Sequence, residues 1–315
     1  MDSKWSPHDS HGTGCEAQMS AKILDGKAIS EQVLAETKAG IAAFRKAHGI
    51  TPGLAFVRVG EDPASVVYVK AKAKMCERLG IRSQTLILPE GANEANLLEL
   101  IRSLNGQKTV HGILVQSPLM AGISQDRVFE AIDPHKDVDG FHPLNLGKLA
   151  VGDPNGFVAC TPAGIHQLLI RGGIPITGRH VVILGRSRIV GKPMSLILTQ
   201  KGKDADATVT ICHSRSRDLE SLTRQADILI AALGRRRFVK AGMVSKGIVV
   251  IDVGINRVSD ASKRDGFRLE GDVDYTAVAK KAGWITPVPG GVGPMTIAML
   301  MANTLKAAQM QNPSR

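Results

Sequence analysis

Short apolar segments of strand length alternate with segments of helical spacing along almost the whole chain, and this order limits the possible folds more than any other feature. In the first half of the chain we expect strands at residues 53–60, 82–88 and 111–116 and helices at residues 27–47, 65–80, 94–105 and 124–132. Strands that are separated by helices in this way form a parallel sheet covered by helices. The first half is therefore predicted to be an α/β unit.

The same order of elements recurs in the second half of the chain. Here we expect strands at residues 180–184, 208–212, 227–233 and 248–253, with helices after the first strand and at residues 219–226. This succession is half of a dinucleotide-binding fold, so the second α/β unit is predicted to be Rossmann-like. The segment 295–310 also has a helical apolar face, but its periodicity does not tell which unit it packs against.

The two units are joined by residues 133–164, a segment rich in glycine, proline, aspartate and asparagine. Such a composition is typical of a long functional connection, and we place the boundary between the units near residues 140–143. Residues 1–20 are polar and have no hydrophobic signal core, so they are interpreted as a mobile extension.

Net charge and composition narrow the possible partners. The formal net charge of +11 would suit nucleic acid, an anionic membrane or small polyanionic ligands. Only 3% of the residues are aromatic, and the basic residues are scattered apart from Arg235–Arg237, which disfavours nucleic acid. No apolar run approaches the roughly 20 residues of a membrane span, and the four cysteines are widely spaced, which suits a reducing cytosol. We expect a cytoplasmic protein with neither nucleic acid nor membrane as its partner.

Lys72 differs from the other lysines of the helix that is expected at residues 65–80. On a helical wheel Lys70 and Lys74 belong to a polar arc, whereas Lys72 projects from the apolar arc. Lys72 could simply lie along the edge of the core, with Tyr68, one turn earlier, as ordinary packing. Alternatively, apolar neighbours would favour the neutral amine, so that Lys72 could exchange protons in acid–base catalysis while Tyr68 offers a stacking face. The helix alone does not decide between the two.

A glycine-containing loop follows the first strand of the second unit. Gly185 comes directly after this strand and Gly191 opens the next helix, which is where backbone N–H groups meet a phosphate. Ser187 stands where the second glycine of the GxGxxG motif would be, so a plain strand-to-helix turn remains an alternative. The surrounding order of strands and helices favours a dinucleotide site.

The residues after the second strand of this unit favour NADP over NAD. An NAD site usually has an acidic residue there to bind the ribose hydroxyls, but this sequence continues with His213, Ser214 and Arg215. Together with Arg186 in the glycine-containing loop, they offer donors to a 2′-phosphate. They could also be exposed loop residues without a ligand, which is the interpretation that we favour for Arg217.

An amide and two carboxylates follow the last strand of the first unit. Gln116 ends this strand, at the edge where α/β proteins usually bind ligands, and Asp137 and Asp139 lie in a later loop. The two aspartates could simply make a turn or cap a helix. No further carboxylates follow at EF-hand spacing and the histidines form no ligand cluster, so no metal is expected.

In its motifs and their order, the chain resembles the bifunctional methylenetetrahydrofolate dehydrogenase/cyclohydrolase family. The resemblance extends from about residue 23 to residue 308, through VGEDPAS, YVKAK, GILVQSPL, KDVDGFHPLNLGKL, GRSRIVGKPM, TVTICHSRS, IDVGIN and PVPGGVGPMT. It implies the oxidation of 5,10-methylenetetrahydrofolate to the 5,10-methenyl form, with hydride passing to NADP. Hydrolysis to 10-formyltetrahydrofolate would follow in the same cleft, as part of the one-carbon metabolism that serves purine biosynthesis.

The resemblance also implies roles for single residues. Tyr68 would stack on the folate ring system, and Lys72 would take part in catalysis, above all in the cyclohydrolase step. Gln116 would tune this lysine and Asp139 would hold the pterin. The further folate contacts that it implies are Val115, Pro289, Gly290, Gly291 and Val292. The NADP contacts that it implies are Gly185, Arg186, Ser187, Gly191, Ser214, Arg215 and Ile255. Ser117 is a departure, because the family usually has leucine after the glutamine.

For the whole chain, the resemblance implies that the C-terminal helix returns to the first unit and that the active-site cleft lies between the units. The predicted division is a catalytic and folate unit of residues 21–141 plus 296–315 and an NADP-binding unit of residues 142–295. A homodimer formed through the cofactor units is also implied. The alternatives are a relative with only one of the two activities, a non-catalytic nucleotide or folate sensor, and a basic RNA-binding protein.

Overall fold

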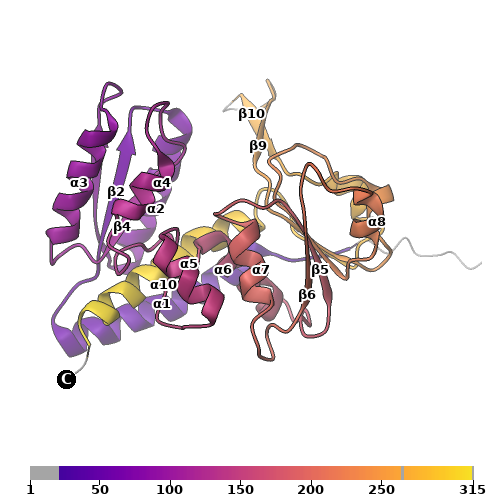
Figure 1. Cartoon of the computed structure of the whole chain (residues 1–315), viewed down its shortest axis with the longest axis horizontal. Coiled ribbons are helices and arrows are strands. Elements are labelled where there is room, and N and C mark those ends of the chain that lie inside the picture. Colours follow the sequence, from indigo (N-terminus) through magenta and orange to yellow (C-terminus); the bar gives the residue numbers. More distant parts are fainter. Residues whose placement is uncertain (1–20, 264–265, 314–315) are drawn as a thin grey trace, which may run out of the picture.

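The computed structural model describes residues 21–263 and 266–313, and the predicted extension 1–20 lies outside them. Two α/β units lie side by side, and long helices run from one to the other (Figure 1). No helix of the described residues is long and apolar enough to cross a membrane.

The first unit is built on a parallel sheet that has three strands in the described part of the chain, in the order β3-β2-β4. Its elements are β2 (Gly53–Val59), α2 (Pro63–Leu79), β3 (Arg82–Leu88), α3 (Glu94–Gly106), β4 (Gly112–Val115) and α4 (Gln125–Ala131). Apolar side chains of the central strand β2, such as Ala55 and Val57, are buried against Leu97, Ile101 and Leu104 of α3. The predicted parallel α/β unit is confirmed.

The second unit is built on a parallel sheet of six strands among the described residues, in the order β1-β11-β8-β7-β5-β6. Its strands are β1 (Lys22–Ile23), β5 (His180–Leu184), β6 (Thr208–Cys212), β7 (Ile228–Ala231), β8 (Val249–Asp252) and β11 (Trp284–Ile285). Its smaller elements are α7 (Gly191–Leu198), α8 (Leu219–Arg224), η1 (Ala241–Met243), α9 (Tyr275–Val278) and the hairpin of β9 (Asn256–Ser259) and β10 (Phe267–Glu270). Because β6 is added on one side of β5 and β7 on the other, the ends of β5 and β7 form the crevice where such sheets bind ligands.

Two helices that were not predicted lie partly or wholly in the segment that was interpreted as a connection. They are α5 (Pro143–Val151) and α6 (Cys160–Arg171). The glycines and prolines of this segment concealed them, because both residue types usually interrupt helices. Pro143 and Pro162 lie in the first turns of α5 and α6, where the missing N–H would have had no intrahelical partner.

The two ends of the described chain cross between the units. Helices α1 (Gly26–His48) and α10 (Val292–Gln311) lie side by side, and α10 also packs against α6 and contacts α2, β4 and β2 (Figure 1). The C-terminal helix therefore returns to the first unit. At the other end, β1 pairs in parallel with β11 of the second unit.

The pairing of β1 corrects one detail of the predicted division, which placed residue 21 and those after it in the first unit. Lys22 lies opposite Trp284, and Ile23 lies opposite Ile285. Two residues carry no recognisable strand pattern, so their place in the distant sheet depends on tertiary packing alone. The other boundaries of the division stay a prediction.

Candidate active site

A cavity of about 170 Å³ lies where the end of β4 meets α2, α6, α10 and the loop after α4. It is lined by Lys72, Leu114, Val115, Gln116, Ser117, Gln125, Asp139, Phe141, Cys160, Thr161, Ile189 and Thr296. Four of the residues that we predicted to act on folate are thus brought together, although up to 67 positions separate them in the sequence, from Lys72 to Asp139. Ile189 comes from the second unit, so both units contribute to the cavity.

Lys72 reaches this cavity because of the way in which α2 begins and turns. The carboxylate of Asp62 caps the helix by accepting a hydrogen bond from the backbone N–H of Ser65 at 2.7 Å. Lys70 and Lys74 are exposed, whereas Lys72 is half-buried on the opposite face. Its Nζ donates to Oε1 of Gln116 at 3.1 Å. The helical wheel was therefore right to separate Lys72 from its neighbours.

Gln116 is itself held in one orientation. Its backbone N–H donates to the carbonyl of Val57 at 2.8 Å, which continues the sheet beyond the end of β4. Its Nε2 donates to the carbonyl of Ser117 at 2.7 Å, which leaves Oε1 directed at Lys72. The hydroxyl of Ser117 accepts a hydrogen bond from Gln125 at 2.8 Å. The serine at this departure from the family pattern thus has a polar partner.

Asp139 is a carboxyl group with an altered acidity. Burial is the main reason that the pKa of Asp139 is raised to about 6; the nearby charge of Lys72 and a hydrogen bond from Cys160 oppose this rise, and the nearby charge of Asp137 adds to it. Near neutral pH both protonation states are therefore accessible. A carboxyl group of this kind can accept or donate a hydrogen bond to a ligand in the cavity.

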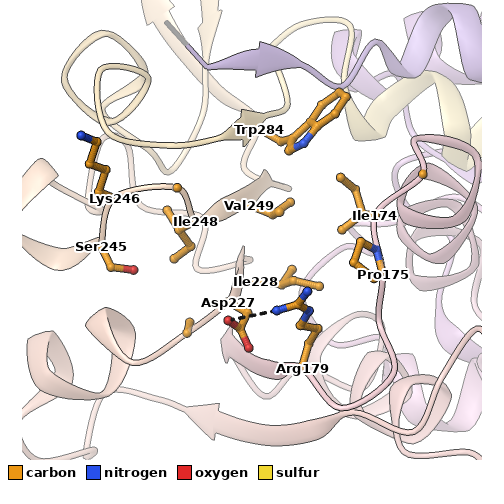
Figure 2. Close-up of a pocket in the computed structure, with 13 residues that line it drawn as sticks. Ile174, Pro175, Arg179, Asp227, Ile228, Ser245, Lys246, Ile248, Val249 and Trp284 are labelled. Atoms are coloured by element: carbon orange, nitrogen blue, oxygen red, sulfur yellow. Dashed lines mark ion pairs between the residues drawn. The ribbon is translucent and has the colours of Figure 1, made fainter. Parts of the chain in front are cut away.

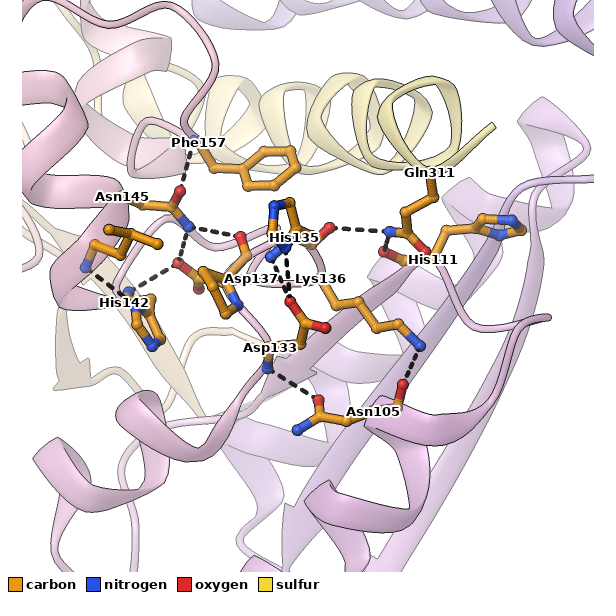
Figure 3. Close-up of polar contacts among 12 residues, drawn as sticks. Asn105, His111, Asp133, His135, Lys136, Asp137, His142, Asn145, Phe157 and Gln311 are labelled. Carbon is orange, nitrogen blue, oxygen red and sulfur yellow. Dashed lines mark hydrogen bonds and ion pairs between the residues drawn. The ribbon is translucent and has the colours of Figure 1, made fainter. Parts of the chain in front are cut away.

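Asp137 has the structural role that was the simpler interpretation of this pair of aspartates (Figure 3). Its carboxylate accepts hydrogen bonds from the backbone N–H groups of Phe141 and His142, at 3.1 and 2.8 Å, and from Nδ2 of Asn145 at 2.9 Å. These bonds close the turn that contains Asp139. Asp137 therefore fixes the position of Asp139 without lining the cavity itself.

The start of the same loop is attached to the end of α3 through Lys136 (Figure 3). The buried ammonium donates to the carbonyls of Leu104, Asn105 and Gln107, at 3.2, 2.7 and 2.9 Å. A cation at a helix C-terminus is favourable because the last carbonyls have no partner in the helix. Burial lowers the pKa of Lys136, and the nearby charge of Asp133 opposes this effect. The loop is thus anchored at both ends.

The remaining predicted folate contacts lie outside the lining of this cavity. Tyr68 lies one turn before Lys72 on α2 and is 38% exposed. The backbone of residues 289–292 packs against the start of α1, where the N–H of Lys27 donates to the carbonyl of Gly290 at 3.1 Å. A Cβ atom on Gly26 would lie only 1.8 Å from the carbonyl oxygen of Gly291. The roles of these residues toward folate stay predictions.

The glycine-containing loop after β5, residues 185–191, forms a cradle of backbone that leaves no room for a side chain at Gly185 or Gly191. Gly185 has a φ of 123°, and a Cβ atom there would lie 2.3 Å from the carbonyl oxygen of Ala232 after β7. A Cβ atom on Gly191 would lie 2.1 Å from the carbonyl oxygen of Gly185. Arg186 and Ser187 between them are exposed. The loop therefore closes the crevice between β5 and β7 with free backbone and side-chain donors.

The segment after β6 lies next to this cradle. The N–H of Gly185 donates to the carbonyl of Cys212 at 2.9 Å, which joins the two loops, and Ser214 and Arg215 beyond it are exposed. Ile255 follows β8 and is 47% exposed. Exposed donors and the lack of a carboxylate at positions 213–215 fit a dinucleotide with a 2′-phosphate. The contacts of single residues with NADP stay predictions.

Comparison with known proteins agrees with this arrangement. Residues 24–139 match the catalytic domain of tetrahydrofolate dehydrogenase/cyclohydrolase, and residues 159–312 match its NAD(P)-binding domain. The chain belongs to the tetrahydrofolate dehydrogenase/cyclohydrolase family. The bifunctional protein FolD of Chlorobium luteolum is 55% identical to it, over 92% of this chain and 99% of that protein.

Solved structures of the family have the same fold. The bifunctional enzyme FolD from Campylobacter jejuni, a methylenetetrahydrofolate dehydrogenase/cyclohydrolase, superposes with a TM-score of 0.86 and 47% identity, over 92% of this chain and 99% of that chain. The Trypanosoma brucei enzyme, which was solved with NADP and an inhibitor, superposes with a TM-score of 0.88 and 35% identity, over 94% of this chain and 99% of that chain.

Several residues that line the cavity of this family member were missed from the sequence. Cys160 and Thr161 lie at the start of α6, and the hydroxyl of Thr161 is 3.1 Å from that of Thr296 on α10. They were missed because their segment was interpreted as a connection. Pro162, directly after them, was the available signal, since proline is tolerated in the first turn of a helix.

A second cavity, of about 320 Å³, lies at the amino ends of β5, β7, β8 and β11 (Figure 2). Apolar side chains such as Ile228 and Trp284 line it, and Arg179 forms an ion pair with Asp227 at 3.8 Å near its edge. It contains none of the predicted site residues and lies at the end of the sheet opposite Gly185. Within the described residues, no group of three or more histidine, cysteine or acidic side chains could hold a metal ion.

Proposed function

We propose that the chain oxidises 5,10-methylenetetrahydrofolate with NADP and hydrolyses the methenyl product to 10-formyltetrahydrofolate. The observation that carries this proposal is the hydrogen bond of 3.1 Å between Lys72 and Gln116, in a cavity shared with Asp139. Membership in the tetrahydrofolate dehydrogenase/cyclohydrolase family and the cradle around Gly185 support it.

Lys72 is proposed to move protons in the hydrolytic step. In this step water adds to the cationic methenyl carbon and loses a proton, which a nearby amine can accept; the bond from that carbon to N5 then breaks, N5 takes up a proton, and the formyl group stays on N10. Gln116 would orient the amine, because its Oε1 accepts a hydrogen bond from Lys72 and its own amide group is fixed by Ser117. Half-burial of Lys72 keeps bulk water from competing for this contact.

Asp139 is proposed to bind the pterin ring and so to set the position of the reacting carbon. Its carboxyl group faces the cavity from a turn that Asp137 holds closed. Tyr68, Val115 and residues 289–292 are proposed as further folate contacts. NADP, when bound, accepts the hydride, and residues 185–187, 191, 214, 215 and 255 are proposed to hold it.

We further propose a cytoplasmic homodimer that acts in the one-carbon metabolism serving purine biosynthesis. The free thiols of Cys76, Cys160 and Cys212 support a reducing compartment. Dimerisation through the cofactor units rests on the resemblance to the family, and light scattering of the purified protein measures it directly. Nucleic acid is not proposed as a partner, because Arg236 and Arg237 of the basic run form ion pairs with Glu270.

The test is turnover of 5,10-methylenetetrahydrofolate with NADP and with NAD, measured side by side. We expect the methenyl form to appear faster with NADP and then to decay to the 10-formyl product. Accumulation of the methenyl form without enzymatic decay would instead indicate a relative that has only the dehydrogenase activity. No turnover with either nucleotide, together with tight RNA binding at physiological salt, would contradict the proposal.

A further inference from the structure

Arg188 lies in the loop between Gly185 and Gly191 and reaches across to the first unit. One guanidinium nitrogen contacts Oδ1 of Asp126 on α4 at 2.5 Å, and the other donates to the carbonyl of Phe141 at 3.0 Å. The guanidinium also lies over the ring of Phe129, 5.8 Å from its centroid. The side chain of Arg188 is 24% exposed, so these contacts remove most of it from water.

One of the three partners of Arg188 belongs to the wall of the cavity that contains Lys72 and Asp139. Phe141 lines this cavity and follows Asp139 by two residues. Ile189, the neighbour of Arg188 in the loop, lines the same cavity from the other side. One side chain therefore connects the loop that is proposed to cradle the nucleotide with the turn that presents Asp139.

The cradle itself does not depend on the side chain of Arg188. The hydroxyl of Ser187 accepts a hydrogen bond from the N–H of Val190 at 3.1 Å, and its carbonyl accepts one from the N–H of Lys192 at 3.0 Å. Gly185 is held by Cys212 of the neighbouring strand. Loss of the guanidinium would leave these bonds in place.

We propose that Arg188 is a positioning residue. It fixes the position of the two units relative to each other for hydride transfer, and it contributes little to hydrolysis. This inference rests on the proposed function. Hydride transfer needs a folate held by the first unit and a nucleotide held by the second at a fixed separation. Small errors in their relative position lower the rate of such a step strongly. Hydrolysis of the methenyl form takes place in the folate cavity and needs no nucleotide.

The experiment compares both activities in Arg188→Gln with those of the wild-type protein. Loss of the two charge-assisted contacts should lower kcat of the dehydrogenase by about tenfold. The rate of hydrolysis of added methenyltetrahydrofolate, measured without nucleotide, should change by less than about twofold. The Kd for NADP, measured by calorimetry, should also change by less than about twofold, because neither quantity depends on the relative position of the two units. In Arg188→Lys the kcat of the dehydrogenase should lie between that of the wild type and that of Arg188→Gln, because one ammonium group cannot replace the planar guanidinium that contacts both acceptors.

A neighbouring arginine provides the matched control. Arg127 forms an ion pair with Glu94 at 2.5 Å that joins α4 to α3 within the first unit. Arg127→Gln should therefore leave the ratio of the two activities unchanged. Asp126→Asn keeps Arg188 and weakens only its ion pair, so it should lower the dehydrogenase in the same direction but by less. This variant also decides the question if Arg188→Gln fails to fold.

Two outcomes would overturn the inference. In the first, both activities of Arg188→Gln fall together, which would assign Arg188 a general structural role. In the second, neither activity changes although the protein is folded by circular dichroism. If the wild-type protein itself shows neither activity, the proposed function fails instead, and the two failures are therefore distinguishable.

Discussion

At the scale of single residues, Lys72 and Lys74 share a helix but not an environment. Lys74 is exposed, whereas Lys72 is half-buried and bonded to Gln116. Lys72→Met should lower cyclohydrolase turnover by at least about a hundredfold, because a positioned acid or base typically contributes that much. NADP affinity, measured by calorimetry, should stay as it is.

Lys74→Met is the control for this variant, since it removes an equal side chain from the exposed face of the same helix. It should retain nearly full activity in both steps. Full cyclohydrolase activity in Lys72→Met would refute the role that we assign to Lys72.

Asp139 leads to a prediction about stability and pH. Its pKa is about 6 in the folded protein, above its usual value of 3.8, so the folded state binds the proton more tightly than the unfolded state does. The stabilisation that this proton gives is complete below pH 3.8 and is lost as pH rises through about 6. The loss amounts to about 3 kcal/mol at neutral pH.

Asp139→Asn removes this titration, so the variant should gain free energy of unfolding relative to the wild type as pH rises from 4 to 7. Urea unfolding at several pH values measures the difference. Asp153→Asn should show its effect below pH 3.8 instead, and with the opposite sign, because hydrogen bonds from Asn155 and nearby lysines lower the pKa of Asp153 and the wild type loses this stabilisation only as pH falls. A difference that does not depend on pH for Asp139→Asn would contradict the assigned pKa.

At the scale of elements, two helical glycines have opposite surroundings. A Cβ atom on Gly164 of α6 would lie 2.8 Å from Cβ of Met295 on α10, whereas one on Gly147 of α5 would meet nothing within 4 Å. Gly164→Ala should lower the free energy of unfolding by about 1–3 kcal/mol through overpacking. Gly147→Ala should raise it by about 0.5–1 kcal/mol, because alanine favours the helix more than glycine does.

Urea unfolding of both glycine variants, followed by circular dichroism, checks this pair. A rise in both would mean that the contact between α6 and α10 is not tightly packed at Gly164, and a fall in both would mean that Gly147 is not a free helical position. Activity offers a second measurement, since Thr161 and Thr296 on these helices line the cavity that contains Lys72, which we propose as the folate site. A shift of α6 against α10 should therefore also raise KM for folate.

Elements with a clear period were predictable from the sequence, and elements fixed by distant contacts were not. Apart from β1 and β11, which have only two residues each, the strands of both sheets follow from apolar runs such as residues 180–184, and α2 follows from its start signals and its amphipathic spacing. Helices α5 and α6 were concealed by glycine and proline, and β1 is too short to show a pattern. Its pairing with β11 comes from tertiary packing.

At the scale of the whole molecule, the cavity depends on elements that lie far apart in the chain. The phase of α2 singled out Lys72, and the end of a strand singled out Gln116, because both signals are local. Choosing Asp139 over Asp137 required the resemblance to the family, since two aspartates in one loop look alike in the sequence. Thr296 and Ile189 become cavity residues only once α10 and the second unit are in place.

The crossing of both chain ends between the units has a consequence for how such a protein can be divided or recombined. A cut at the connection between the units would leave β1 without its sheet and α10 without α1. A gene split at that point would encode two halves that can complete their packing only by assembling with each other. An exchange of one half between relatives would pair α1 and β1 of one protein with α10 and β11 of another. The two units are therefore suited to being inherited as a single module.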